Sequence, residues 1–472
     1  MKSKICMQEH FSEAQYEQMI DALFHRFPSF QKVGAGAYKP GIGNMEFIDQ
    51  LLGHPHKNYK VIHVAGTNGK GSVSNMMTSA LAASGYNVGL YTSPHILDFR
   101  ERIRVCHPDP LCHPERSEGS VKLIPKHDVW NFIQKWQETF DHLDMSFFEI
   151  TTAMALNWFA EQKVDYVVLE TGLGGRLDST NIVNPVLSVI TNIGLDHCDL
   201  LGDTLPEIAF EKAGIIKPRV PVVVGESSSE INEVFERKVL YTNLSDPMFM
   251  GNRSAIMSLL TYADKAEPAL WSEREKILAE MDLRGEYQRK NLRTALTALD
   301  VLGTKCDERI REAIVHTAKR TGFRGRWDQV SENPRVICDI GHNEHGLKYN
   351  FAQLTKMQES GEVSNLVIVY GSVADKDVDA AVRLLPDKAI YVFTNAQGKR
   401  ALPASEVLEK YQAFCREAGR EVGEVHCVST VAEAKEKAYS IVDAISTEKS
   451  GASTLIYVGG STYVVSEFVS LI

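Results

Sequence analysis

Short apolar runs rich in β-branched residues alternate along this chain with stretches of helical periodicity. The first unit is VIHVAG (61–66), which is followed by a glycine-rich turn, a helical run over about 72–84 and the apolar run VGLYTS (88–93). Two further runs, VDYVVLE (164–170) and PVLSVITNIG (185–194), have the length and composition of buried strands. This alternation predicts an α/β fold in which helices cover a mainly parallel sheet.

The pattern is interrupted near RTGFRGRWD (320–328), where glycines and basic residues break the periodicity. Beyond it, strand and helix patterns alternate again as far as TLIYVGG (454–460). A chain of 472 residues is also too long for one comfortable hydrophobic core. We therefore predict two domains, a larger α/β domain over residues 1–325 and a smaller Rossmann-like α/β domain over residues 326–472.

Composition and charge exclude several classes of protein. Lys and Arg number 51 against 61 Asp and Glu, and the resulting net charge of -10 argues against a nucleic-acid-binding surface. No apolar run approaches the ~20 residues that cross a bilayer, and the first residues lack the apolar core of a secretory signal. The eight scattered cysteines contain no CxxC pair and are expected to be reduced thiols. We expect a cytoplasmic protein that binds neither nucleic acid nor membrane.

The segment AGTNGKGS (65–72) lies between a predicted buried strand and a predicted helix. Glycines allow several backbone N–H groups to face one phosphate, and the helix N-terminus adds positive potential. Lys70 would reach the β- and γ-phosphates, although Val64 and Gly71 depart from the strict GxxxxGK[ST] pattern. The alternative is a glycine-rich turn without a ligand, but a lysine among three glycines favours nucleotide binding. The predicted nucleotide-binding residues here are Gly66, Thr67, Asn68, Gly69, Lys70, Gly71 and Ser72.

The departure from the strict pattern is informative, because GTNGKGS resembles the phosphate loop of the Mur ligase superfamily. Motifs over nearly the whole chain, in the family's order, resemble the folylpolyglutamate synthase/dihydrofolate synthase family within it. They include AYKPG (37–41), KVIHVAGTNGKGSV (60–73), LYTSPH (90–95), RERIRV (100–105), FFEITTAMAL (147–156), ETGLGGRLDSTNIV (170–183), ITNIGLDH (190–197), GDTLPEIAFEKAGIIK (202–217), FRGRWD (323–328), DIGHNEHG (339–346), ADKD (374–377) and VGGS (458–461).

The resemblance implies a P-loop ATPase domain followed by a Rossmann-like ligase domain, with ATP and Mg2+ as cofactors. It also implies an ATP-dependent ligase that joins L-glutamate to the carboxylate of dihydropteroate or tetrahydrofolate through an acyl phosphate. Such chemistry needs cations to neutralise phosphoryl charge and a site that excludes water. Single residues do not decide whether the chain makes dihydrofolate as well as extending the glutamate tail. The family is commonly monomeric, so a monomer is expected.

Three residues are candidate metal ligands. Ser93 and Glu170 each follow an apolar strand and so lie at the carboxyl edge of the predicted sheet, where ligands gather in α/β folds. By resemblance they bind magnesium, for which oxygen ligands are suited. The resemblance makes His197 a ligand of a second magnesium, although imidazole is an unusual ligand for this ion. The alternatives are helix caps for Ser93 and Glu170 and an ordinary hydrogen-bonded histidine.

Lys212, in FEKAGIIK, could be a helix-surface lysine paired with Glu207 or Glu211. The resemblance instead implies that carbon dioxide carbamylates it, which gives an anion that faces magnesium. Carbamylation requires a neutral amine, which burial or a nearby metal could supply. Together with Lys70 and His197, it is predicted to be catalytic.

The second domain is expected to hold ATP as well. Asn291 lies in the helical segment 286–303 and resembles an adenine or phosphate contact of the family. Arg326, also predicted to be catalytic, could fork onto the γ-phosphate or the acyl phosphate. Asp339 and His342 are expected at the ribose or adenine, in a loop that reads DIGHNEHG where DGAHNP is commoner in the family.

Other polar residues have two open interpretations. Arg176, Asp178 and Asn181 either surround the reacting phosphate or stabilise a tight connection. Lys376 either binds glutamate or phosphate, or is a solvated lysine at a helix start.

Substrate recognition is the least defined part of the prediction. FQKVGAGAYKPG (30–41) could be a lid over a flat pterin, and Arg100 and Arg102 could bind a glutamate carboxylate, but all could equally be surface features. HPDPLCHPERSEGSVK (107–122) is predicted to be an exposed loop without an assigned function.

Three other functions compete with this hypothesis. A Mur-type ligase for a cell-wall nucleotide precursor usually carries an extra N-terminal domain, for which the residues before position 65 leave too little chain. A P-loop phosphotransferase or switch ATPase would leave the second sheet with Asp339 and His342 unexplained. A non-catalytic nucleotide-binding module would not need the set of Lys70, Glu170 and His197.

Overall fold

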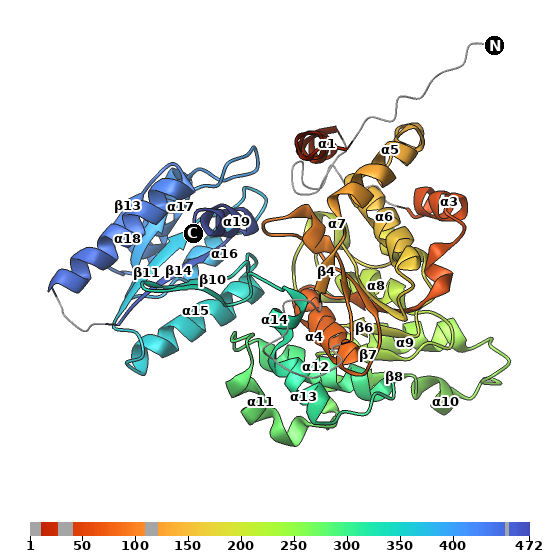
Figure 1. The fold of residues 1–472 in the computed structure, drawn as a ribbon. Coiled ribbons are helices and arrows are strands. Elements are labelled where there is room, and N and C mark those ends of the chain that lie inside the picture. Colours follow the sequence, from red (N-terminus) through yellow and green to blue (C-terminus); the bar gives the residue numbers. More distant parts are fainter. Residues whose placement is uncertain (1–10, 27–40, 109–120, 449–452) are drawn as a thin grey trace, which may run out of the picture.

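The computed structural model describes residues 11–26, 41–108, 121–448 and 453–472. Within them the chain forms two α/β halves that lie side by side, each built around its own sheet (Figure 1). Most of the lid predicted at 30–41 and of the loop predicted at 107–122 lies outside the described residues. The fold class predicted from the sequence is confirmed.

The sheet of the first half has eight strands among the described residues, in the order β4-β3-β2-β5-β1-β6-β7-β8. All neighbouring strands are parallel except for the antiparallel pairs β2–β3 and β3–β4. The strands are β1 (Lys60–Ala65), β2 (Val88–Tyr91), β3 (Ile103–Cys106), β4 (Val121–Leu123), β5 (Tyr166–Glu170), β6 (Leu187–Ile190), β7 (Val222–Val224) and β8 (Leu260–Tyr262).

Helices cover both faces of this sheet because successive side chains of a strand point to opposite faces. Along β1, Ile62 and Val64 pack into the core with α4 and α12, whereas Val61 packs into the core with α5 and α6. The helices of this half are α1 (Glu13–Arg26), α3 (Gly43–Leu51), α4 (Lys70–Ala83), α5 (Lys126–His142), α6 (Phe147–Glu161), α7 (Cys198–Leu201), α8 (Leu205–Lys212), α9 (Asn232–Asn243), α10 (Arg253–Met257), α11 (Arg274–Glu280), α12 (Gln288–Val301), α13 (Glu308–Val315) and α14 (Thr317–Thr321).

The second half has a six-stranded sheet in the order β13-β12-β11-β14-β10-β9, parallel except for β9. Apolar cores lie on both of its faces, one with α15, α16 and α17 and one with α18 and α19. Its strands are β9 (Asp328–Glu332), β10 (Arg335–Cys338), β11 (Asn365–Tyr370), β12 (Ile390–Phe393), β13 (Val425–Cys427) and β14 (Thr454–Gly459). Its helices are α15 (Glu344–Glu359), α16 (Val378–Arg383), α17 (Ala404–Glu417), α18 (Val431–Glu448) and α19 (Thr462–Ser470).

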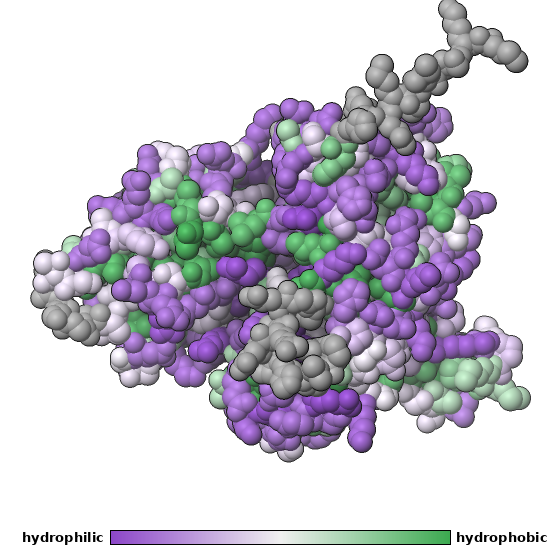
Figure 2. Space-filling model, in the orientation of Figure 1, coloured by the Kyte–Doolittle hydropathy of each residue, from purple (hydrophilic) through white to green (hydrophobic). Residues whose placement is uncertain are grey.

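The carboxyl ends of the central strands supply the loops at the junction between the halves. The phosphate loop (residues 65–72) follows β1, Ser93 follows β2 and Asp339 follows β10. Figure 2 shows hydrophobic residues on both sides of this junction, among mainly hydrophilic ones. Among the described helices, none has the length and apolar character needed to cross a bilayer.

Candidate active site

The phosphate loop has a backbone that only glycine can adopt at two positions. Gly66 has a φ of 149°, and a Cβ there would lie 1.9 Å from Oγ1 of Thr191. Gly69 directly precedes α4 with a φ of 82°, and a Cβ there would lie 2.2 Å from Oδ1 of Asn291. The glycines therefore permit close approach of neighbouring side chains as well as the left-handed turn into the helix.

The loop is held in place by the turn that follows β6. The hydroxyl of Thr67 donates to the carbonyl of Gly194 (3.0 Å), and the backbone N–H of Asn68 donates to Oδ1 of Asn192 (2.8 Å). The strand predicted at 185–194 ends at Ile190, because the residues after it turn towards the loop. The loop is thus shaped by its own half of the protein.

Helix α12 supports the loop from the other side. Nε2 of Gln288 donates to Oγ of Ser72 (3.1 Å), and Nδ2 of Asn291 donates to Oε1 of the same glutamine (2.9 Å). The structure therefore brings the predicted nucleotide residues Ser72 and Asn291 together. Gln288, which sequence reasoning did not single out, connects them.

Two lysines converge on one carbonyl of the phosphate loop. Nζ of Lys70 and Nζ of Lys212 each donate to the backbone oxygen of Gly66 at 3.0 Å. Lys212 is 4% exposed, and burial, reinforced by the charge of Lys70, lowers the pKa of its amine to about 7. The surface-lysine alternative is therefore wrong, and Glu211 pairs with Arg176 instead (2.8 Å).

Ser93 and Glu170 lie together at the carboxyl edge of the first sheet. The backbone N–H of Ser93 donates to Oε2 of Glu170 (3.1 Å), and no described residue forms a hydrogen bond with Oε1. Glu170 is 3% exposed, and burial raises the pKa of its carboxyl. A buried carboxylate with an oxygen to spare, beside a serine hydroxyl, fits a hard divalent cation. Within the described residues no three His, Cys, Asp or Glu side chains cluster as a metal site, so the chain alone does not supply a complete ligand set.

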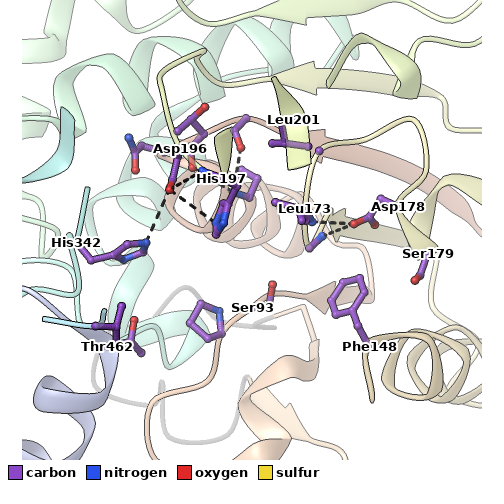
Figure 3. Close-up of a pocket in the computed structure, with 18 of the residues that line it drawn as sticks. Ser93, Phe148, Leu173, Asp178, Ser179, Asp196, His197, Leu201, His342 and Thr462 are labelled. Atoms are coloured by element: carbon purple, nitrogen blue, oxygen red, sulfur yellow. Dashed lines mark hydrogen bonds and ion pairs between the residues drawn. The ribbon is translucent and has the colours of Figure 1, made fainter. Parts of the chain in front are cut away.

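Asp196 is the centre of a charged cluster that joins the halves, and sequence reasoning missed it. One of its oxygens lies 2.5 Å from Nζ of Lys376, and Nε2 of His197 and of His342 lie 3.8 and 4.0 Å from the carboxylate (Figure 3). Burial opposes ionisation of Asp196, but these three neighbours hold its pKa well below the usual value. Burial lowers the pKa of His197 to about 3, so this imidazole is neutral. Lys376 is thus a partnered residue of the junction and not a solvated lysine.

An amide pair also crosses the junction. Nδ2 of Asn343 donates to Oδ1 of Asn68 in the phosphate loop (3.1 Å) and to Oδ2 of Asp196 (2.9 Å), and Nδ2 of Asn68 donates back to Oδ1 of Asn343 (3.3 Å). The same Asn343 oxygen accepts from the N–H of Gly346 at the start of α15. The second half is therefore in direct contact with the predicted nucleotide loop.

Arg326 belongs to a smaller cavity next to the metal candidates, which Ser93 and Glu170 also line. Its guanidinium lies 5.5 Å from the ring centre of Phe323, and Nη1 donates to the carbonyl of Gly325 (3.2 Å). The side chain is half-buried and faces the same edge of the first sheet as the phosphate loop. This position agrees with a phosphate contact, which stays a prediction.

Asp339 accepts four hydrogen bonds, all from protein donors. Oδ2 accepts from the hydroxyl of Tyr287 (2.6 Å) and the N–H of Trp327 (2.8 Å), and Oδ1 accepts from the N–H of Gly341 (2.7 Å) and Nδ2 of Asn350 (2.8 Å). A carboxylate offers about four acceptor positions, so all of them are taken in this structure. The predicted ribose or adenine contact of Asp339 stays a prediction, and the structure shows in addition that this residue connects α12, the linker and β10.

The polar residues of the glycine-rich segment after β5 mainly stabilise its turn. Asp178 accepts from the N–H groups of Gly172 and Leu173 (2.9 and 2.8 Å), and Nδ2 of Asn181 donates to the carbonyls of Arg176 and Gly214. These contacts support the structural interpretation of the segment. Asp178 also lines the cavity described next.

A cavity of about 280 Å³ lies between the halves and unites most of these groups. The first half contributes the phosphate loop, Ser93, His197 and Lys212, and the second half contributes His342 and Lys376. An apolar wall completes it, formed by Phe147, Phe148, Leu173, Leu177 and Leu201. Figure 3 shows Phe148, Leu173 and Leu201 on the side away from His342.

Phe147 and Phe148 open the motif FFEITTAMAL, but the sequence alone indicates no role for the two rings. The start of their helix could have been recognised, because Ser146 and Glu149 form a capping box that fixes where α6 begins. A capped helix start that presents two aromatic rings beside a glycine-rich segment is typical of a site for a flat ligand.

Comparisons with known proteins agree with this architecture. The Mur ligase middle domain matches residues 138–299, and the Mur ligase glutamate ligase domain matches residues 325–447. A dihydrofolate synthase/folylpolyglutamate synthase of Bacillus subtilis is 36% identical over 358 residues, which cover 74% of this chain and 79% of that protein.

Two solved structures extend the similarity to the whole fold. The Mycobacterium tuberculosis folylpolyglutamate synthase complexed with ADP is 25% identical, with a TM-score of 0.76 and coverage of 97% of this chain and 98% of that one. The E. coli FolC complex with DHPP and ADP is 25% identical, with a TM-score of 0.73 and coverage of 97% of both chains.

Two α/β halves that close a phosphate loop, a buried lysine and a carboxylate into one cavity define a Mur ligase-type ATP-dependent ligase. The domain matches are to the middle and glutamate ligase domains of that class. Within it, the chain belongs to the folylpolyglutamate synthase/dihydrofolate synthase family. The family and enzyme class predicted from the sequence are confirmed.

Proposed function

We propose that this ligase uses ATP to join L-glutamate to the carboxylate of a folate or pterin, extending tetrahydrofolate and also making dihydrofolate from dihydropteroate. The observation that carries the proposal is the single cavity in which the phosphate loop and Lys212 face the apolar wall of Phe147 and Phe148. A flat ring fits the aromatic wall, while its carboxylate reaches the phosphate-binding end. The relatives support the proposal. The Bacillus subtilis relative is named for both synthase activities, and the E. coli FolC structure is a complex with DHPP and ADP.

ATP and Mg2+ have suitable partners in this chain. The phosphate loop offers N–H groups, the helix start and Lys70 to the phosphates. Asn291 lies beside Gly69 of the loop, and Arg326 and His342 line the adjoining cavities, so that all three could make further contacts with ATP. Ser93 and Glu170 would hold magnesium, with His197 at a second ion. When bound, the metal would neutralise charge on the transferring phosphoryl group.

The protein's own residues bind, orient and exclude water. Lys70 and the loop would hold the γ-phosphate near the acceptor carboxylate, so that a carboxylate oxygen attacks the phosphorus, ADP leaves and an acyl phosphate forms. The amine of glutamate then attacks the acyl carbon, an amide bond forms, and phosphate and one proton leave. The neutral imidazole of His197 can accept a hydrogen bond without adding positive charge. Contacts of Asp196 with Lys376 and Asn343 close the second half over the cavity, which protects the acyl phosphate from hydrolysis.

Lys212 is proposed to be carbamylated. Its amine attacks carbon dioxide, an N–C bond forms and one proton leaves, so that a donor becomes an anion able to face magnesium. The burial of this amine and its lowered pKa of about 7 support this step, since a protonated lysine has no lone pair to react. Incubation with ¹³C-labelled carbon dioxide should give one carbamate signal in NMR spectra that is absent from Lys212→Met.

The deciding experiment is phosphate release from MgATP with L-glutamate and either dihydropteroate or tetrahydrofolate. Glutamate-dependent release with both acceptors establishes the bifunctional enzyme, and release with tetrahydrofolate alone limits it to tail extension. If folded protein that binds ATP releases no phosphate with either acceptor, the folate assignment is refuted and another Mur-type acceptor is favoured.

Three further expectations belong to this proposal. We propose a monomer, a cytoplasmic location, and a domain boundary between residues 325 and 326. Light scattering tests the monomer, fractionation of cells that make the protein tests the location, and limited proteolysis of the linker tests the domain boundary.

A further inference from the structure

Arg102 is a buried guanidinium that interacts with Glu170 and Glu101 only at longer range. It is 3% exposed, and its Nε donates to Nδ1 of His95 (2.8 Å). Among the described residues, its two terminal nitrogens have no hydrogen-bond acceptor, and no carboxylate forms an ion pair with it. Burial of an unpaired charge costs free energy, so an anion that reaches this guanidinium is bound favourably.

The guanidinium is held rigidly at the edge of the active-site cavity. It ends the short 3₁₀ turn Phe99–Arg102, lines the cavity and lies 5.2 Å from the ring centre of Phe147. Nδ1 of His95 accepts the Nε–H of Arg102, so this ring nitrogen carries no proton of its own. The orientation of the fork is therefore fixed before a ligand binds.

Arg102 differs in this respect from the other cations of the cavity. Four other Lys and Arg side chains line the cavity, and each of them donates to an acceptor of the protein. They are Lys70, Lys212, Lys376 and Arg400. Arg400, from the second half, pairs with Asp375 (2.5 Å). Arg102 alone presents terminal nitrogens to the cavity that no described residue satisfies.

The neighbouring Arg100 is a natural comparison. Its Nε and Nη2 donate to the carboxylate of Asp98, the latter at 2.7 Å, and it does not line the cavity. The structure thus separates two arginines that the sequence treated alike. Only Arg102 is available to a ligand.

We propose that the terminal nitrogens of Arg102 bind a carboxylate of the incoming L-glutamate. This subsite rests on the proposed function. The planar fork matches a carboxylate in a bidentate arrangement. The acceptor's reacting carboxylate belongs at the phosphate loop, whereas Arg102 also interacts electrostatically with Tyr463 of the second half, which lines the cavity as well. Dihydropteroate has only the carboxylate that reacts, so with this acceptor L-glutamate is the substrate that has a carboxylate left for this guanidinium.

The test compares Arg102→Gln and Arg102→Lys with Arg100→Gln as the matched control. Phosphate release is measured while glutamate, ATP and acceptor are varied separately. Arg102→Gln should raise the KM for glutamate about 100-fold while kcat and the KM for ATP stay within a few-fold. Arg102→Lys, which keeps the charge but loses the fork, should fall in between, and Arg100→Gln should behave as wild type.

Each outcome bears on the subsite. An unchanged glutamate KM in Arg102→Gln overturns it, and so does a rise confined to the KM of tetrahydrofolate with dihydropteroate unaffected, because the guanidinium would then hold the tail carboxylate of the acceptor. Thermal unfolding of the variants checks their fold, and Arg102→Lys decides the case if Arg102→Gln melts earlier. Wild-type protein without any glutamate-dependent release would instead refute the proposed function.

Discussion

The two sides of the active-site cavity are built in different ways. The phosphate loop takes nearly all its support from the first half, through Asn192, Gly194 and Gln288. The opposite side depends on contacts that cross the junction, chiefly Lys376 to Asp196. We infer that the nucleotide site exists before closure, whereas the amino-acid side is completed only when the halves come together. Ligand order follows, with ATP able to bind first.

The largest effect is expected at the preformed side. Lys70→Ala should lower turnover about 1,000-fold or more, because the phosphates lose their principal side-chain cation. The fold should survive, since among the described residues the ammonium of Lys70 donates hydrogen bonds only to the backbone carbonyls of Gly66 and Thr67. Phosphate release and thermal unfolding measure both, with the exposed Lys135→Ala as control. Turnover near the wild-type rate would refute the phosphate-loop assignment.

The closure side is tested by Asp196→Asn. Removal of this charge leaves the half-buried Lys376 without its partner, so kcat/KM for glutamate should fall about 10- to 100-fold. The Kd for ATP, measured by calorimetry, should hardly change, because the phosphate loop keeps its own contacts. The exposed Asp199→Asn, three residues further along in the short helix α7, is the control. Equal losses for ATP and glutamate would contradict the proposed difference between the two sides.

A third test uses the pH dependence of stability. The folded-state pKa of Lys212 is about 7 and its ordinary value is 10.5, so between these values the unfolded chain binds more protons and stability rises with pH. Relative to Lys212→Met, the wild type should gain about 2–3 kcal/mol between pH 7 and 9. Chemical denaturation in buffer free of carbon dioxide measures this. Parallel curves for the two proteins would show that the amine is not buried as described.

The smallest effect concerns the bond from α12 to Asp339. Tyr287→Phe removes one of four donors to this carboxylate and should cost about 1 kcal/mol of unfolding free energy. Chemical denaturation can detect the loss, and Tyr241→Phe, at a 72% exposed position, should be neutral. Identical stability of the two variants would show that the bond across the junction contributes nothing.

The sequence predicted the fold class because buried strands and a glycine loop are local patterns. It missed β9, whose residues DQVSE include a single apolar side chain and are all half-buried or exposed at the edge of the second sheet. The strand predicted around β6 is also longer than the one observed, because Asn192 and Gly194 form hydrogen bonds with the phosphate loop instead of continuing the strand. Tertiary contact, and not local propensity, decided both.

The candidate site shows the same limit. The residues Lys70, Glu170 and His197 follow strands in recognisable motifs, and the structure gathers them around one junction. Asp196 adjoins His197, but its importance depends on Lys376, which is 180 positions away in the chain. Arg100 and Arg102 look equivalent in sequence, and only burial and pairing separate them. Partnership across the junction is invisible to a local pattern.

The four hydrogen bonds to Asp339 determine how a substitution at this position would affect the protein. Each comes from a different segment, the start of α12, the linker, the loop after β10 and helix α15. An amide at this position would set an N–H₂ group against two of those donors, and alanine would leave all four without an acceptor. In a cell, substitutions of Asp339 would therefore lower the amount of folded enzyme. Substitutions of Lys70 would leave the amount unchanged and remove the activity.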